Sequence, residues 1–141
     1  MTATGGKDAM NSLQTKTAGE DLTGYRILIV EDDYLVASDL CEALRSRGAT
    51  VLGPTPDMRK GRKLLQQQRP DCALLDINLN GELVFEFADE LKAQSVRTIF
   101  TTGYDTAFLP PRLNRTPCVQ KPVNFNALVS LIRDTRAVPQ S

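Results

Sequence analysis

Four short apolar segments of this 141-residue chain end on, or are followed by, side chains that could do chemistry. In chain order these are 26–30 with Glu31, Asp32 and Asp33, then 72–76 with Asp76, then 97–101 with Thr101 and Thr102, then 116–120 with Lys121. Mg²⁺ prefers carboxylate oxygens, a threonine hydroxyl can donate to a phosphoryl oxygen, and a lysine can neutralise its charge. Carboxylates held together repel each other, which favours a bound cation or a raised pKa. These residue types indicate a metal-assisted phosphoryl site, provided that the fold brings them together.

The composition excludes several other kinds of site. The chain contains no histidine, which rules out histidine-based triads, histidine general acids and histidine-ligated zinc. It has no tryptophan and 6% aromatic residues, so base-stacking platforms for single-stranded nucleic acid are not expected. Cys41, Cys72 and Cys118 are far apart and form no C-x-x-C pair, so we interpret them as thiols of a protein in the reducing cytoplasm.

The elements that must position these residues follow from the apolar periodicity. Strands are expected over 26–30, 50–53, 72–76, 97–101 and 116–120, and helices over 34–47, 57–68, 83–93 and 124–138. Between the last two strands, Pro110-Pro111 favours a short or irregular fourth helix. The fold class is therefore α/β, with a five-stranded parallel sheet covered by helices on both faces. In such sheets, ligands bind at the carboxyl ends of the strands near the switch in strand order.

The first helix carries two more specific expectations. Its buried face should consist of Leu35, Val36, Leu40, Ala43 and Leu44. Asp33 lies directly before this helix, so it is better interpreted as an N-cap than as a metal ligand.

The chain is expected to contain one folded domain over residues 24–138, a flexible leader over 1–23 and a short tail over 139–141. The leader is polar and lacks the apolar core of a secretory signal. The 17 basic and 17 acidic residues balance, and no apolar run approaches the roughly 20 residues of a membrane-spanning helix. We therefore expect a cytoplasmic protein that binds neither DNA nor a membrane.

Four segments in order and spacing, ILIVEDD, ALLDINL, FTTGY and VQKP, resemble the receiver domain of bacterial two-component response regulators. The resemblance extends over about residues 25–138 and implies the flavodoxin-like (βα)₅ receiver fold. FTTGY is also similar to the F-x-T-G-Y sequence of a subgroup of single-domain receivers, which is associated with HWE-type sensor kinases.

The resemblance implies a role for each residue at the strand ends. Asp76 would be the phosphoacceptor that attacks the phosphoryl group of a phosphohistidine. Thr102 would be the switch hydroxyl, and Lys121 would contact the phosphoryl oxygens. The Mg²⁺ ligands would be Glu31, Asp32, Asp76 and the backbone carbonyl of Asn78. No other cofactor is implied, and the side chains of Asn78 and Tyr104 would tune hydrolysis of the phosphoryl group.

At one position the chain departs from the family. Receivers commonly have Tyr or Phe three residues before the lysine, where this chain has Cys118. A thiol cannot make the same bulky swing, so Tyr104 is a candidate for part of that role. Together with Pro110-Pro111, this predicts a signalling surface that is mobile before phosphorylation and ordered afterwards.

The leading hypothesis is a stand-alone receiver, not an enzyme. A sensor histidine kinase or a histidine phosphotransfer protein would phosphorylate it, and its phosphorylated surface would bind an unknown downstream protein. The alternative is a phosphate sink or relay without an output partner. A haloacid dehalogenase-type phosphatase is disfavoured because Asp76-Ile77-Asn78 lacks the second acid of a D-x-D motif.

Overall fold

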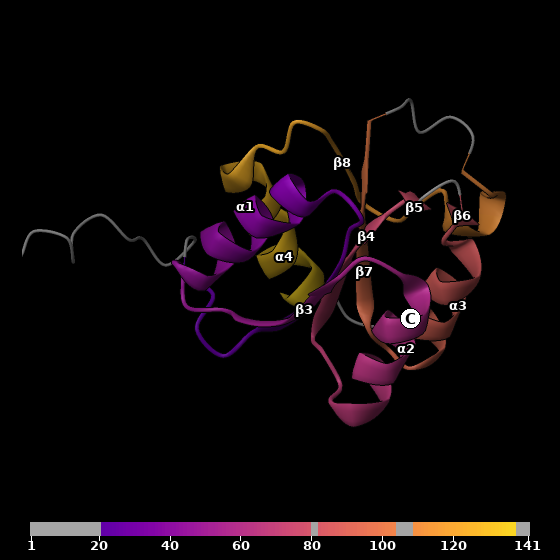
Figure 1. Cartoon of the computed structure of the whole chain (residues 1–141), viewed down its shortest axis with the longest axis horizontal. Coiled ribbons are helices and arrows are strands. Elements are labelled where there is room, and N and C mark those ends of the chain that lie inside the picture. Colours follow the sequence, from indigo (N-terminus) through magenta and orange to yellow (C-terminus); the bar gives the residue numbers. More distant parts are fainter. Residues whose placement is uncertain (1–20, 80–81, 104–108, 138–141) are drawn as a thin grey trace, which may run out of the picture.

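A five-stranded parallel sheet forms the centre of the computed structural model, which describes residues 21–79, 82–103 and 109–137 (Figure 1). The strands are β2 (Arg26–Val30), β3 (Thr50–Thr55), β4 (Cys72–Asp76), β7 (Arg97–Thr102) and β8 (Cys118–Gln120). Their order in the sheet is β3-β2-β4-β7-β8, so β3 and β8 lie at the edges. The five expected strands are confirmed; β3 and β7 run slightly longer than expected and β8 is shorter.

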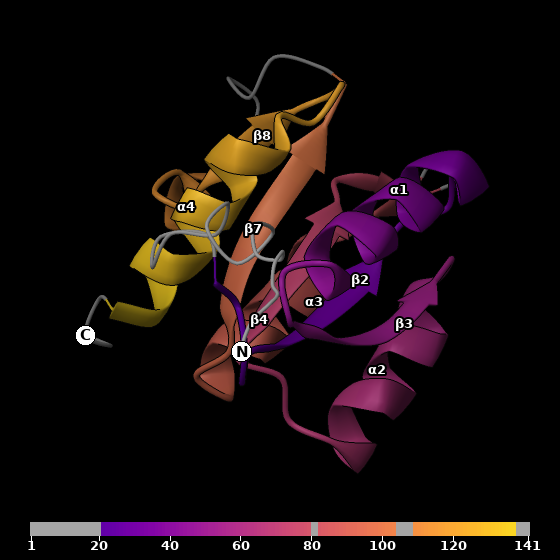
Figure 2. The same cartoon turned by 90° about the vertical axis from the view of Figure 1, so that its left-hand side faces the viewer.

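Two pairs of helices cover the two faces of the sheet (Figures 1 and 2). One face carries α1 (Tyr34–Arg45) and α4 (Phe125–Ala137), and the other carries α2 (Met58–Gln67) and α3 (Phe85–Ala93). Alternate residues of each central strand therefore contribute to different cores. In β2, Ile27 and Ile29 pack on the α1/α4 side, and Leu28 and Val30 pack on the α2/α3 side. All four side chains are fully buried, which explains the continuous apolar run in the sequence.

Side-chain caps fix where the helices begin. The Asp33 carboxylate accepts hydrogen bonds from the backbone N–H groups of Leu35 and Val36, which confirms its role as the N-cap of α1. The Asp57 carboxylate caps α2 through the N–H of Lys60. Such caps contribute about 1 kcal/mol each because they satisfy N–H groups that the helix itself leaves unpaired.

The expected buried face of α1 is wrong at Leu35, whose side chain is 72% exposed. Ala37 is buried instead, alongside Leu40, Cys41 and Leu44. The helix packs on the sheet through a stripe centred on Leu40 and Leu44, and Leu35 lies outside that stripe. Counting apolar residues at helical spacing does not reveal which side of a broad apolar face meets the sheet.

Two connections differ from regular helices and loops. A 3₁₀ helix, Pro111–Leu113, lies between β7 and β8 where a fourth helix was expected to be irregular, and the rest of that connection is described only from residue 109. After β4, the short strands β5 (Asn78–Leu79) and β6 (Glu82–Leu83) pair antiparallel in a segment where no strand was expected. Strand β5 begins two residues after Asp76.

The packed domain begins before residue 24. Leu22 is fully buried in the α1/α4 core, and its backbone N–H donates to the Arg47 carbonyl oxygen at 2.8 Å. Leu22 therefore belongs to the domain, two residues inside the segment expected to be a leader. Residues 1–20 of that leader, and the tail 139–141, lie outside the described residues. Within the described parts of the chain, none of the helices has the length and apolar character needed to cross a membrane.

Candidate functional site

The strand order determines where the acidic residues meet. Strands β2 and β4 are neighbours, and the connections that leave their carboxyl ends lead to opposite faces of the sheet, to α1 after β2 and to α3 after β4. This switch point is where open parallel sheets bind ligands. Glu31 and Asp32 follow β2 here, and Asp76 is the last residue of the neighbouring strand β4.

The sheet brings these three carboxylates together as the sequence predicted. One carboxylate oxygen from each of Glu31, Asp32 and Asp76 lies within 4.8 Å of the other two. Glu31 is 3% exposed and Asp76 is 7% exposed, whereas Asp32 is half-buried. Two of the three negative charges are therefore almost completely removed from water, which is costly unless positive charge or hydrogen bonds compensate.

Lys121 supplies the compensating charge. It follows β8, and its Nζ lies 3.1 Å from Asp76 Oδ2 and 3.0 Å from Glu31 Oε1. Its hydrogen bond to Glu31 goes to the other oxygen, Oε2, at 3.2 Å. The Lys121 backbone N–H donates to the Thr102 carbonyl oxygen at 2.8 Å, which ties the lysine to the end of β7. A cis peptide bond joins Lys121 to Pro122.

Backbone N–H groups hold the two buried carboxylates in place. The Asp33 N–H donates to Glu31 Oε2 at 3.0 Å, and the Asn78 N–H donates to Asp76 Oδ1 at 3.1 Å. In each case the donor lies two residues after the acid in the sequence. With Lys121 bound to Oδ2 and the Asn78 N–H bound to Oδ1, both oxygens of Asp76 accept hydrogen bonds, and the carboxylate has a defined orientation.

Burial and ion pairing act in opposite directions on the pKa values of Glu31 and Lys121. Burial raises the pKa of Glu31 from 4.5 to about 7, and the neighbouring Asp76 charge adds to this, while hydrogen bonds from the Asp33 N–H and Lys121 oppose it. Burial acts to lower the pKa of Lys121, but its hydrogen bonds to Glu31 and Asp76 outweigh burial and raise this pKa. Lys121 is therefore held as a cation next to two acids that compete for it.

The carboxylate cluster fits a divalent cation. Glu31 Oε1 is buried, and its only polar neighbour among those described is the Lys121 ammonium at 3.0 Å, with no hydrogen bond of good geometry, so it can also face a cation beside two further carboxylates. Hard oxygen donors of this kind suit Mg²⁺, and a cation would relieve the repulsion between the acids. The residues that could hold it are Glu31, Asp32 and Asp76.

The remaining residues of the predicted site occupy different positions. Thr101 and Thr102 are both 1% exposed, and the strand register places Thr101, not Thr102, opposite Asp76. The Asn78 residue is exposed, and Tyr104 lies outside the described residues. Cys118 is half-buried against the α2/α3 core, where burial raises the pKa of its thiol. All three cysteines are free.

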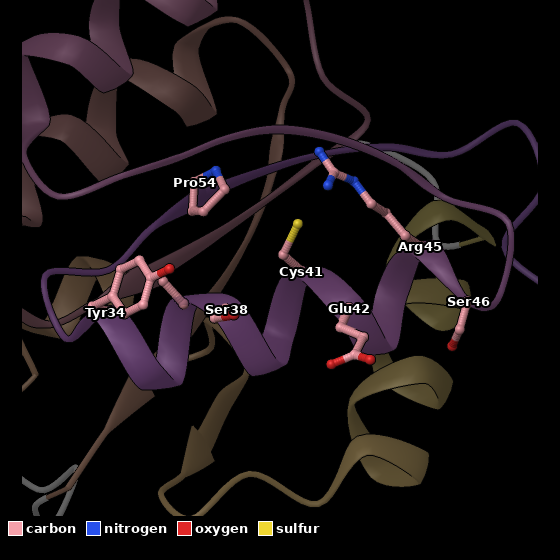
Figure 3. A pocket seen from close by; sticks show the side chains of 8 residues that line it. Tyr34, Ser38, Cys41, Glu42, Arg45, Ser46 and Pro54 are labelled. Atoms are coloured by element: carbon pink, nitrogen blue, oxygen red, sulfur yellow. The ribbon is translucent and has the colours of Figure 1, made fainter.

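A groove that the sequence did not predict lies beside α1, where this helix faces the edge strand β3 (Figure 3). It has a volume of about 670 Å³ and runs between α1 and Pro54 of the edge strand β3. Tyr34 lies at one end, the Cys41 side chain points into the middle, and Arg45 lies at the other end. No catalytic pattern marks these residues in the sequence; the only signal was Tyr34, an aromatic residue at the start of a helix.

A comparison with protein families identifies the family of the chain. The family described as response regulator receiver domain matches residues 27–133, which is most of the chain and includes every residue of the carboxylate cluster and Lys121. The chain belongs to this family. The resemblance seen in the four sequence segments is thereby confirmed, and the protein is a signalling domain of the two-component type.

Three relatives show how far the similarity extends. The sensory transduction protein LytT of Bacillus cereus is 27% identical over 120 residues, which cover 82% of this chain and 49% of LytT. The solution structure of SdrG from Sphingomonas melonis is 26% identical, with a TM-score of 0.70, and the match covers 86% of this chain and 100% of SdrG. The response regulator PhyR of Brucella abortus is 25% identical, with a TM-score of 0.71, over 92% of this chain and 54% of PhyR. The chain spans about half or less of the length of the curated relatives it matches.

Proposed function

We propose that this receiver accepts a phosphoryl group on Asp76 from a phosphohistidine. The donor protein is either a sensor histidine kinase, of the HWE type or of another type, or a histidine phosphotransfer protein. The observation that carries the proposal is the ion-pair geometry at the sheet edge. Asp76 lies within 4.8 Å of two further acids and 3.1 Å from the Lys121 ammonium. An isolated carboxylate at a strand end would need neither the acids nor the lysine.

In the transfer, a carboxylate oxygen of Asp76 forms a bond to phosphorus while the bond from phosphorus to the histidine nitrogen breaks. The electron pair of the broken bond remains on the imidazole of the donor. The product is an acyl phosphate on Asp76. Histidine is required only on the donor, which agrees with its absence from this chain.

The residues around Asp76 act by position and charge. The Asn78 N–H orients the carboxylate, and Lys121 is close enough to contact the oxygens of a phosphoryl group attached to Asp76. A bound Mg²⁺, held by Glu31, Asp32, Asp76 and the Asn78 carbonyl, would neutralise charge on the phosphoryl oxygens. Thr102 is the candidate switch hydroxyl, because its backbone already contacts Lys121.

We further propose that the chain acts as a stand-alone receiver whose β7–β8 connection is the output surface for a downstream protein. The match to SdrG covers all of that chain, which supports a receiver that works by itself. Phosphorylation adds about −1.5 to −2 charges next to Lys121, whose backbone is bonded to the end of β7. Hydrogen exchange over 102–116 with and without beryllofluoride tests the coupling, and equal protection in both states would refute it.

A phosphate sink or relay is the second candidate. It is favoured by the half-buried thiol of Cys118 where receivers commonly have the switch aromatic, because a small side chain weakens the usual coupling to an output face. The lifetime of the acyl phosphate and the rate of reverse transfer to the kinase separate the two functions. Fast reverse transfer favours the sink. The three free thiols suit the cytoplasm, where we place either function.

Incubation with radiolabelled acetyl phosphate and Mg²⁺ tests the phosphoacceptor directly. We expect one labelled site in the wild type, loss of the label with excess EDTA, and loss in Asp76→Asn. Asp71→Asn is the matched control, because Asp71 precedes the same strand but its carboxylate binds the Arg26 N–H at the opposite end. Labelling of Asp76→Asn at the wild-type level would refute the assignment.

A further inference from the structure

The edge strand β3 contains a bulge where it pairs with the end of β2. Between the pair Leu28–Leu52 and the pair Val30–Thr55, β2 advances by two residues and β3 advances by three. One extra residue of β3 therefore lies between these two pairs. Bulges of this kind bend a strand and are over-represented next to active sites, where they redirect a neighbouring residue.

Gly53 and Pro54 explain why the bulge lies at this point. Gly53 has a φ of 90°, in the left-handed region that favours glycine. A Cβ on Gly53 would lie 2.9 Å from the Thr55 nitrogen and 3.1 Å from the Ile29 carbonyl oxygen, and both of these are backbone atoms. Pro54 has no N–H to donate to the sheet, and prolines within sheets are found at edges and bulges. The bulge therefore requires a glycine and accommodates the proline that follows it.

The bulge determines which carbonyl group holds the backbone of Glu31. In an uninterrupted register, Val30 would lie opposite Pro54, whereas the extra residue places Thr55 opposite Val30. The Thr55 carbonyl oxygen then accepts the N–H of the next residue, Glu31, at 2.9 Å. Thr55 is 4% exposed, so this acceptor is a fixed point within the packed domain.

Glu31 is thereby held at its backbone as well as at its carboxylate. The carboxylate is bound by the Asp33 N–H and by Lys121. The hydrogen bond to Thr55 fixes the point from which the Glu31 side chain leaves the sheet. Groups that orient a metal ligand matter for binding, and their loss typically lowers metal affinity by about 10–100-fold.

We propose that the bulge of β3 is a positioning element for the cation site, and that Gly53 is its positioning residue. Gly53 allows Thr55 to bind the Glu31 N–H, which sets where the Glu31 carboxylate lies relative to Asp32 and Asp76. Gly53 has no side chain to offer the cation, so it acts only through Glu31. The inference rests on the Mg²⁺ site proposed above and not on the transfer of the phosphoryl group.

An Mg²⁺ titration of the full chain, followed by the NMR shifts of backbone amides, measures the effect. In Gly53→Ala, the new Cβ meets backbone atoms of Thr55 and Ile29, so β3 must move away from β2 at this point. We expect the dissociation constant for Mg²⁺ to rise about tenfold. Gly53→Asn should raise it less, because asparagine adopts a positive φ more readily than alanine.

Gly48→Ala is the matched control. Gly48 has a φ of 98°, and a Cβ there would lie 2.6 Å from Thr23 Oγ1. The substitution therefore forces alanine into the same region of φ, but just before the opposite end of β3. Both variants should lose stability, whereas Gly48→Ala should leave the dissociation constant for Mg²⁺ within about twofold of the wild type. An equal rise in both variants would overturn the inference.

Hydrogen exchange of the Glu31 amide reports the positioning contact itself. The bond from the Glu31 N–H to the Thr55 carbonyl oxygen closes one end of the β2–β3 pairing, and the bond from the Thr50 N–H to the Tyr25 carbonyl oxygen, at 2.9 Å, closes the other. Gly53→Ala should accelerate exchange of the Glu31 amide about tenfold more than exchange of the Thr50 amide, because the opening is local. Equal acceleration of the two amides would contradict the proposal.

The wild type provides the test if Gly53→Ala does not fold. Because coupling between two events is reciprocal, Mg²⁺ binding must strengthen the contact that positions Glu31. Saturating Mg²⁺ should therefore slow exchange of the Glu31 amide about fivefold more than exchange of the Thr50 amide, and equal slowing would refute the coupling.

The outcomes also separate this inference from the proposed function. An unchanged dissociation constant for Mg²⁺ in folded Gly53→Ala, with labelling of Asp76 by acetyl phosphate intact, would overturn the role of Gly53 alone. A wild type that binds no Mg²⁺ would overturn the role of Gly53 together with the proposed cation site.

Discussion

Removal of Lys121 tests the electrostatic account of the site most directly. Lys121→Met keeps most of the side-chain volume but leaves Glu31 and Asp76 buried next to each other without their cation. Without Mg²⁺, we expect the free energy of unfolding to fall, because the two carboxylates lose both their ion pairs and their shared hydrogen-bond donor.

The magnitude follows from the geometry. At 3.1 Å and an effective dielectric constant of about 20, one Lys121–Asp76 charge pair attracts by about 5 kcal/mol before desolvation is counted. Removing one partner of a fully buried pair costs about 3–5 kcal/mol, whereas an exposed pair is worth at most about 1 kcal/mol. The Lys121 side chain is 23% exposed, and Glu31 can take up a proton near neutral pH. We therefore expect a loss of about 2 kcal/mol, between these two limits.

A double-mutant cycle isolates the pair. Urea unfolding at about pH 7.5 in EDTA, with wild type, Lys121→Met, Asp76→Asn and the double variant, should give a coupling free energy of about 1–2 kcal/mol. In Asp76→Asn, the lysine keeps Glu31 as its partner, so this single variant should lose less stability than Lys121→Met. Lys121→Arg is the control that retains the charge, and it should lose less stability than Lys121→Met.

Addition of Mg²⁺ should recover part of the stability that Lys121→Met loses, because the cation neutralises the same two carboxylates. A coupling free energy below about 0.3 kcal/mol in EDTA would refute the claim that Lys121 compensates these acids. Stability of Lys121→Met that is indifferent to Mg²⁺ would refute the claim that the cation and the lysine act on one cluster.

Three further outcomes are expected. In a thermal scan, Mg²⁺ should raise the unfolding temperature of the wild type, because a ligand that binds only the folded state stabilises it. The unfolding temperature of Asp32→Asn should remain almost unchanged on addition of Mg²⁺. An equal rise in both proteins would show that Asp32 is not a ligand. Leu40→Ala should cost about 2–5 kcal/mol in urea unfolding and Leu35→Ala less than about 0.5 kcal/mol, and equal losses would contradict the packing of α1. Asp33→Ala should lower the free energy of unfolding by about 1 kcal/mol, because α1 loses its N-cap. Urea unfolding with an unchanged m-value measures this loss, and an unchanged free energy of unfolding would contradict the cap.

Predictions from the sequence succeeded where the cause is local or follows from strand order. Asp33 was predicted as a cap because capping involves only the next three residues. Glu31, Asp32 and Asp76 were predicted to meet because the carboxyl ends of parallel strands share one edge of the sheet, and their oxygens do lie within 4.8 Å. Both inferences need only the type of element and its position in the chain.

Predictions failed where the result depends on which surfaces pack together. Leu35 has the right residue type and spacing for a core position, but the sheet meets α1 on a neighbouring stripe and leaves Leu35 exposed. The β5–β6 hairpin was missed because strands of two residues are too short to show a periodicity. Leu22 was placed in a polar leader because a single apolar residue carries no pattern, although it is fully buried.

The sequence by itself determined the class of fold, the residues at the strand ends and the chemistry that they suit, because these depend on residue type and on the order of elements. Only the tertiary structure decided that the Lys121 ammonium lies between Glu31 and Asp76, and that a groove runs between α1 and Pro54 of β3. Distances between side chains from different elements depend on how helices and strands pack, and packing is set by the whole core rather than by any one segment.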